Sequence, residues 1–516
     1  MLDATRLRTP CLFDKIVSAD EAAKLITDGM TVGVSGFTPS GYPKKTTLAL
    51  AKAIKNGKKC RINIWSGASV GPEIEEALAE VGGIKSRMPY YAASNKALCQ
   101  QINSGEVTYL DQHLSHFAQQ IDYGFFGDVD IAIVEAAAIN ADGSIVLGPG
   151  VGNTPMLVKH AKKIIVEVNT TIPLSLEGMH DIYICNKPPQ RTEIPIYHVS
   201  DRIGSPYLTC GLDRISCIVE SNIIDHVRNL CDPDEASKKI ACNLVDFLEH
   251  EQRHGRLPQQ MLPLQSGVGS IANAVLLGLA NSKFENLMMY SEILQDSVFK
   301  LIKSGKIVQA SGCAFTPSPR VWEMYKADPE LYRKRIVLRP LDISNSPEVI
   351  RRLGVISMNT PIEFDIYGQA NSTHVMGTRM MNGIGGSGDY MRNGYLTIFS
   401  TPSTAKDGNI SRIVPMVSHA DHTEHDTMVF ITEQGVADIR GLSPIKRAKL
   451  IIEKCAHPDF KDQLYDYLKM AQRKNGHEPV DLAHAFDMHL KLTETGSMKD
   501  TRKEVEQYDY EARITA

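Results

Sequence analysis

The sequence lacks the features that would place the protein in a membrane or on a nucleic acid. No apolar run approaches the ~20 residues that span a bilayer, and the N-terminal segment has no apolar core of signal-peptide length. The formal net charge is −4, whereas nucleic-acid-binding domains normally carry a basic excess. We therefore expect a cytoplasmic protein, or one of an organelle matrix if a presequence has been removed, with neither membrane nor nucleic acid among its partners.

Several common reactive motifs are also missing. The ten cysteines are scattered and no pair has C-x-x-C spacing, which favours reduced thiols over a disulfide framework or a zinc site. The segment His419–Asp426 is rich in His and carboxylates, but it lacks zincin spacing and follows a strand-like run. Such a polar loop favours solvated or mutually hydrogen-bonded side chains, so we expect no metal.

Short apolar segments alternate with helical patterns along the chain, which predicts an α/β fold. Many of these segments are β-branched and apolar on consecutive residues, as expected for parallel strands covered on both faces. The expected strands are 31–35, 62–65, 131–134, 164–168, 287–290, 307–310, 336–338, 413–417 and 428–432. The expected helices include 22–26, 46–54 and 271–279.

A short internal repeat indicates two related halves. Residues 24–37 read KLITDGMTVGVSGF, and residues 300–313 read KLIKSGKIVQASGC. Each copy combines a helix end, a glycine suited to the position after the helix, and a strand that runs into a Ser-Gly turn. We predict two open α/β domains, 1–222 and 223–516, with the junction just before a polar and then Pro-rich segment.

Four glycine-rich turns could let a ligand approach the backbone closely. They read SGFTPSGYPK at 35–44, GPGVGN at 148–153, LQSGVGSIANAV at 264–275 and NGIGGSGD at 382–389. The third is the best candidate for a phosphate or pyrophosphate, because it leads into an apolar-periodic helix that Ser270 can cap. A plain strand-to-helix turn explains the same pattern.

The fourth turn matches G-x-G-x-x-G at Gly383, Gly385 and Gly388. The residues before it form a poor strand, and we expect no helix after it. Both points argue against a dinucleotide site and favour flexible backbone lining an active site.

Two glutamates follow strand-like segments, where open α/β sheets place their ligand crevices. Glu292 comes after the apolar run 287–290, and Glu433 follows 428–431. A carboxylate can be a covalent nucleophile when it is desolvated and aimed at an electrophile. An ordinary polar residue at a strand end is the alternative for both.

The sequence resembles the acetyl-CoA hydrolase/transferase family of class I CoA-transferases, most closely the succinyl-CoA:acetate CoA-transferases. The resemblance covers nearly the whole chain apart from residues 500–516. The motifs that carry it are SGFTPSGYPK, GASVGPE, LPLQSGVGSIANAV, YSEILQD, DISNSPEVIRRLG, DIYGQANST, MMNGIGGSGD, TPSTAK and TEQGVADIRGLSP. It implies two open α/β domains with the active site between them, a homodimer, and acyl-CoA and small carboxylates as substrates, with no permanently bound cofactor.

The resemblance also implies roles for individual residues. Glu292, in YSE-x-x-QD, is the implied nucleophile, and Asn345 and Gly386 surround the reacting acyl group. Ser69 and Glu433 are implied as active-site support. The implied contacts with CoA are Leu264, Gln265, Ser266, Gly267, Val268, Ile362, Asn382, Gly386 and Lys406.

Two other functions fit the same sequence. The first is a thioesterase that hydrolyses acetyl-CoA at the same site, which would turn over without a carboxylate acceptor. The second is a non-catalytic acyl-CoA-binding or regulatory protein, which would not form a covalent adduct on Glu292.

Overall fold

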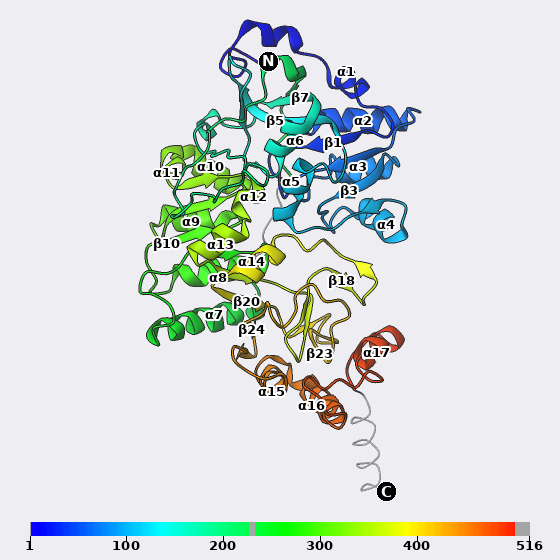
Figure 1. The fold of residues 1–516 in the computed structure, drawn as a ribbon, viewed down its shortest axis with the longest axis vertical. Coiled ribbons are helices and arrows are strands. Elements are labelled where there is room, and N and C mark those ends of the chain that lie inside the picture. Colours follow the sequence, from blue (N-terminus) through cyan, green and yellow to red (C-terminus); the bar gives the residue numbers. More distant parts are fainter. Residues whose placement is uncertain (1, 227–232, 501–516) are drawn as a thin grey trace.

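Two mainly parallel sheets organise the protein in this computed structural model, which describes residues 2–226 and 233–500 (Figure 1). The first sheet has the order β4-β3-β2-β1-β5-β7-β8, and β6 pairs antiparallel with β5. Its strands are β1 Thr31–Val34, β2 Ile62–Trp65, β3 Ile84–Met88, β4 Thr108–Tyr109, β5 Val129–Ile139, β6 Ile145–Leu147, β7 Ala161–Asn169 and β8 Ile215–Ser221.

The second sheet has the order β14-β12-β10-β9-β15-β20-β24-β25, with β25 antiparallel to β24. Its strands are β9 Leu264–Ser266, β10 Leu287–Tyr290, β12 Ile307–Gly312, β14 Ile336–Leu338, β15 Ile356–Asn359, β20 Leu396–Ser400, β24 Val429–Thr432 and β25 Gly435–Asp438. When β9 is matched to β1, the strands on either side follow in the same order in both sheets. The α/β class and the two related open sheets are therefore confirmed.

The repeat that suggested this architecture does not align equivalent strands. It matches β1, a central strand, to β12, which occupies the place of β3 in the second sheet. Gly29 and Gly305 do share a φ of +80°. Only Gly305 directly follows a helix cap, because α9 (Asp296–Lys303) has its C-cap at Ser304, whereas α1 (Ala19–Lys24) has its C-cap at Leu25. The repeat thus reflects a similar helix-to-strand connection in the two halves. Their structural relation is shown by the strand order instead.

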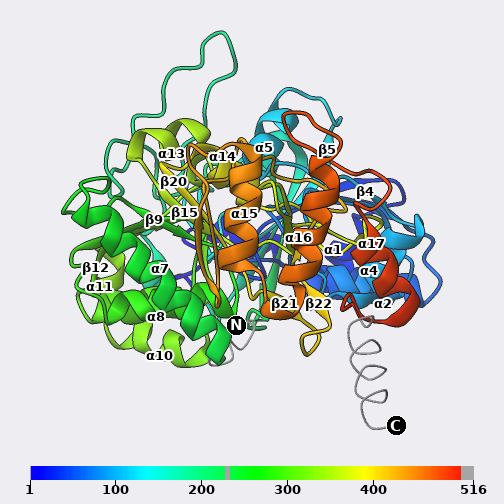
Figure 2. The same cartoon turned by 90° about the horizontal axis from the view of Figure 1, so that it is seen from below.

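Helices cover the sheets and continue beyond them. The other helices of the first half are α2 Lys45–Lys55, α3 Glu75–Glu80, α4 Lys96–Ser104, α5 Leu114–Asp122 and α6 Thr154–His160. Those of the second half are α7 Glu235–Arg253, α8 Ser270–Ala280, α10 Pro319–Ala327, α11 Pro329–Arg333, α12 Leu341–Ser344, α13 Pro347–Leu353, α14 Ser387–Asn393, α15 Pro444–Cys455, α16 Pro458–Gln472 and α17 Asp487–Thr495. Seen from the end that carries α15 and α16, the two halves lie side by side (Figure 2).

Small sheets of short strands supplement the second half. They contain β11 Ile293–Leu294 with β13 Ala314–Phe315, β16 Glu363–Asp365 with β17 Ala370–Asn371 and β23 Ile413–Val414, β18 His374–Val375 with β19 Arg379–Met380, and β21 Thr404–Ala405 with β22 Ile410–Ser411. The strand predicted at 413–417 was too long, since β23 stops after two residues and pairs only with β16 in a small sheet. Pro415 follows immediately and has no N–H for a ladder.

The halves share a continuous apolar core. One cluster of buried side chains includes Trp65 and Val134 from the first half together with Leu287 and Phe315 from the second. The first sheet ends at Ser221 and the second begins at Leu264, and the predicted domain boundary at 222 stays a prediction. Within the described ranges, no helix is long and apolar enough to cross a membrane. Cys231 and the terminal segment 501–516 lie outside the described residues.

Candidate active site

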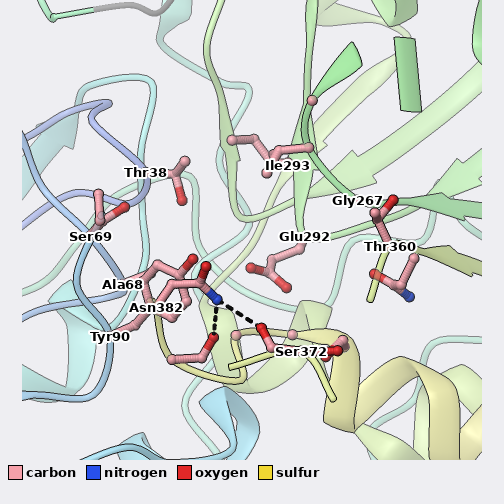
Figure 3. Close-up of a pocket in the computed structure, with 18 of the residues that line it drawn as sticks. Thr38, Ala68, Ser69, Tyr90, Gly267, Glu292, Ile293, Thr360, Ser372 and Asn382 are labelled. Carbon is pink, nitrogen blue, oxygen red and sulfur yellow. Dashed lines mark hydrogen bonds between the residues drawn. The ribbon is translucent and has the colours of Figure 1, made fainter. Parts of the chain in front are cut away.

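A cavity of about 520 Å³ lies where the two halves meet. The first half contributes the turns after β1 and β2, including Thr38 and Ser69, and the second contributes Gly267, Glu292 and Asn382. Figure 3 shows the Glu292 carboxyl between the Thr38–Ser69 side and the Gly267–Thr360 side. The first strands of both sheets therefore end at this cavity, as expected for ligand crevices in open α/β sheets.

Glu292 stands two residues beyond the end of β10. Its backbone is held by β12, because the Cys313 N–H donates to the Glu292 carbonyl at 2.8 Å and the Ser291 N–H donates to the Ser311 carbonyl at 2.9 Å. The side chain is largely surrounded by protein and reaches solvent through the cavity. Burial raises its pKa to about 8, helped by the charge of Asp389 and opposed by the hydrogen bond from Asn345. The carboxyl is thus poorly solvated, as a covalent nucleophile requires.

Asn345 and Gly386 lie directly against this carboxyl. Asn345 Nδ2 donates to Glu292 Oε2 at 3.2 Å, and Ser344 Oγ donates to Asn345 Oδ1 at 3.0 Å. A Cβ added to Gly386 would lie only 1.5 Å from Glu292 Oε2. The carboxyl would therefore have to move to make room for any side chain at 386, and Gly386 is the N-cap of α14.

Most of the predicted CoA-binding residues line the same cavity: Gln265, Ser266, Gly267, Val268, Ile362, Asn382 and Gly386. Two amides fix the turn after β9. The Met358 N–H donates to Gln265 Oε1 at 3.0 Å, and Gln295 Nε2 donates to the Gly267 carbonyl at 3.0 Å. Gln295 also lines the cavity and was not singled out from the sequence, although it lies within the YSEILQD motif.

Four predicted residues do not line the cavity: Asn345, which contacts Glu292 from behind the wall, and Leu264, Lys406 and Glu433. Leu264 is buried in β9, and Lys406 is exposed in the turn between β21 and β22. Glu433 follows β24, and its carboxylate accepts hydrogen bonds from the Ser403 hydroxyl and, at 2.8 Å, from the Ser403 N–H. Ser69, by contrast, lines the cavity, and its carbonyl accepts the Thr38 N–H at 2.8 Å. The roles implied for Leu264, Lys406, Glu433 and Ser69 stay predictions.

Two predictions about the glycine-rich turns were wrong. Gly269 is the N-cap of α8, and no side chain caps that helix, so Ser270 is its first residue and not its cap. Helix α14 begins at Ser387 and so includes the last glycine of the 383–388 turn, whereas no helix was expected after it. The strand before them is the two-residue β19 of an antiparallel pair, so the parallel strand of a dinucleotide site is still absent among the described residues.

The histidine-rich loop has other partners than a metal. His422 is buried with Nε2 3.1 Å from Ser387 Oγ, and His419 Nε2 lies 3.3 Å from Asp421 Oδ1. Across the described part of the chain, no group of three or more His, Cys, Asp or Glu is arranged to hold a metal ion. Arg412, which no motif indicated, also lines the cavity, and its Nη1 donates to Thr401 Oγ1 at 3.0 Å.

The chain is similar to known proteins over most of its length. The chain matches the family models of the acetyl-CoA hydrolase/transferase N-terminal domain at 6–227 and C-terminal domain at 323–468. It is 51% identical to a succinyl-CoA:acetate CoA-transferase of Clostridium kluyveri, covering 96% of this chain and 92% of that one. It is 46% identical to an acetyl-CoA hydrolase of Schizosaccharomyces pombe, covering 95% of this chain and 98% of that one.

Solved structures show the same fold at low sequence identity. RipA from Yersinia pestis superposes with a TM-score of 0.70 at 22% identity, covering 89% of this chain and 98% of that chain. A 4-hydroxybutyrate CoA-transferase from Porphyromonas gingivalis gives a TM-score of 0.61 at 21% identity, with the same coverage. The two family models together match well over half of the chain, and the chain belongs to the acetyl-CoA hydrolase/transferase family.

Proposed function

We propose that this enzyme transfers CoA between small carboxylic acids, with succinyl-CoA and acetate as the leading pair and Glu292 as the nucleophile. The observation that carries the proposal is the poorly solvated Glu292 carboxyl, which faces a cavity between the halves and contacts the Asn345 amide. The names of two relatives support it, the succinyl-CoA:acetate CoA-transferase and, at 46% identity, a propanoyl-CoA:succinate CoA transferase of Escherichia coli.

The proposed reaction begins when a Glu292 carboxylate oxygen attacks the acyl carbonyl of acyl-CoA. The C–S bond breaks, which leaves a mixed anhydride and CoA thiolate. The thiolate attacks the glutamyl carbonyl and expels the first acid, which gives glutamyl-CoA. The second acid then attacks glutamyl-CoA and reverses both steps, so that its own CoA thioester leaves and the Glu292 carboxylate is regenerated.

Each of these steps passes through an oxyanion, and fixed donors beside it lower the barrier. The hydrogen bond from Asn345 Nδ2 to Glu292 Oε2 supports this role for Asn345. The Gly386 N–H is the second candidate, since its residue touches the same oxygen. Binding of CoA in the cavity supplies proximity and remote binding energy.

Hydrolysis of the same intermediates is the alternative, and relatives named acetyl-CoA hydrolases favour it. Hydrolysis needs a general base aimed at a water. The described residues that line the cavity include no histidine, and their carboxylates are Glu292 and Asp296. Asp296 Oδ1 already accepts the Ser318 N–H at 2.7 Å, and the Glu433 carboxylate is engaged by Ser403. This arrangement favours transfer to a carboxylate over transfer to water.

Two measurements test the proposal. Peptide mass analysis after incubation with acyl-CoA and no acceptor should find CoA attached to Glu292, and an adduct elsewhere with Glu292 unmodified contradicts the assignment. Two-substrate kinetics should show ping-pong behaviour, with acetate accelerating the consumption of succinyl-CoA. If free CoA appears as fast without any carboxylate, the enzyme is a hydrolase. The homodimer implied by the family is proposed as well, and sedimentation measures it directly.

A further inference from the structure

Asp389 is a second buried carboxyl beside the candidate nucleophile, and the proposed reaction gives it no role. It lies in the first turn of α14 and is 3% exposed. Asn345 Nδ2 donates to Asp389 Oδ2 at 3.2 Å and, from the same nitrogen, to Glu292 Oε2 at 3.2 Å. A single amide therefore bridges two carboxyls that have little access to water.

The opposite half of the molecule holds Asp389. Ser115, in α5, donates its N–H to Asp389 Oδ2 at 3.0 Å and its hydroxyl to Asp389 Oδ1 at 2.6 Å. Asp111, just before that helix, accepts the Ile384 N–H at 3.1 Å and 2.9 Å on its two oxygens. The first half thus forms hydrogen bonds with both ends of the segment 384–389, and Gly386 lies between these two sets of bonds.

We propose that Asp389 is a positioning residue for the transfer reaction: it turns the Asn345 amide nitrogen towards Glu292, and Ser115 holds it from the opposite half. This inference rests on the proposed function, because it takes Glu292 as the nucleophile. The nitrogen and oxygen ends of an amide have nearly the same shape, and hydrogen-bond partners decide which end faces which neighbour. Asp389 accepts only from the nitrogen end, while Ser344 Oγ donates to the oxygen end at 3.0 Å.

Asp389 also places a negative charge near Glu292. That charge raises the pKa of Glu292 beyond the larger effect of burial. The other ionisable groups that face the pair are Arg392 beside Asp389, and Cys313 and Tyr390 beside Glu292. Removing the charge of Asp389 alone would lower the pKa of Glu292, but loss of the Asn345 hydrogen bond, the larger of the two effects, raises it. Because Glu292 attacks as the carboxylate, a variant that turns the amide nitrogen away from Glu292 should move the acid limb of the rate profile to higher pH.

The first test is Asp389→Asn, with Asp466→Asn on the exposed side of α16 as the matched control. We expect the Asp389 variant to lose kcat by ~10-fold, because its new amide can also donate and no longer selects the nitrogen end of Asn345. Its acid limb should move to higher pH, because the lost Asn345 hydrogen bond outweighs the lost charge. The control should keep both the kcat and the acid limb of the parent enzyme. A lower kcat with an unmoved limb would indicate general damage and overturn the proposal.

A double-mutant cycle then separates positioning through Asn345 from an independent effect. If Asp389 acts through that amide, Asp389→Asn should cost almost nothing further in kcat once Asn345→Ala is present. If the fold-loss in kcat of the double variant equals the product of the two single-variant losses, the proposal is contradicted. Ser115→Ala is the milder variant should Asp389→Asn fold poorly. It keeps the charge of Asp389 and loosens the amide, so we expect a lower kcat with no movement of the acid limb to lower pH, and an unchanged kcat counts against the proposal.

The proposed function fails on a different result. If Glu292→Ala still transfers CoA, the nucleophile has been misassigned, whatever the Asp389 variants show. If Glu292→Ala is inactive and the cycle is multiplicative, Glu292 keeps its role and only the positioning role of Asp389 is lost.

Discussion

Replacing Gly386 with alanine tests the packing around the nucleophile most sharply. The added Cβ would lie 1.5 Å from Glu292 Oε2 and 2.9 Å from Asn345 Nδ2, whereas real Cβ atoms essentially never approach other heavy atoms within 3.0 Å. The carboxyl must therefore retreat by about 1.5 Å, which also separates it from the acyl carbonyl. Since misplacement by ~1 Å can cost a hundredfold in rate, we expect kcat to fall by at least ~10²-fold.

The Gly386→Ala variant should still fold, which makes the kinetic loss interpretable. Gly386 has φ −80° and ψ −7°, a conformation open to any residue. Gly278→Ala in α8 is the matched control, because its Cβ would meet its nearest neighbours at an ordinary 3.5 Å. Two-substrate kinetics and thermal unfolding should be measured on both variants. A Gly386→Ala enzyme whose kcat stays within about threefold of the parent's would refute the reasoning.

Three further predictions concern pH, the amide donor and stability. The kcat/KM for acyl-CoA should rise ~10-fold per pH unit up to about pH 8, because burial raises the pKa of Glu292 to about 8 and only the carboxylate attacks. A pH profile that levels off above pH 4.5, the ordinary pKa of a glutamate, contradicts this. Asn345→Ala should lower kcat by ~10²–10³-fold, and a rise in KM alone would argue against an oxyanion donor. Asp181→Ala should cost ~3–5 kcal/mol in urea unfolding, because it strips the fully buried Arg339 of its ion pair, and a change below ~1 kcal/mol contradicts that account.

Strands were the part of the fold most readable from the sequence. Parallel strands buried on both faces need consecutive apolar residues, and such runs located β2, β10 and β14 with the bounds that the structure has. The same rule failed near Pro415, where an apolar run without a ladder N–H ends in a small sheet. The order of strands within a sheet is set by non-local pairing, which a local repeat could not reveal, and the 24–37 repeat accordingly matched strands in different places.

The candidate site was readable only where its residues cluster in the chain. Glu292 stands at a strand end inside a compact motif that also contains Gln295. Ser115 belongs to no motif, and its partner Asp389 lies 274 positions away, so their pairing exists only in the folded chain. Arg412 lies between β22 and β23, two-residue strands that are too short to give a periodic signal. The sequence therefore could not predict how deeply the site residues are buried or which hydrogen bonds connect the two halves.

The shared strand order explains why one cavity needs both halves. Glu292 follows β10, and the equivalent strand of the first half, β2, is followed by the turn that carries Ser69. Likewise the turns after β9 and β1 supply Gly267 and Thr38 to the same wall. The halves therefore meet along equivalent strand ends, and in the proposed reaction the second supplies the nucleophile and its amide while the first closes the cavity and, through Ser115, holds the segment that contacts them. Because the nucleophile depends on groups from both sides, we expect its reactivity to depend on the contact between the halves as much as on Glu292 itself.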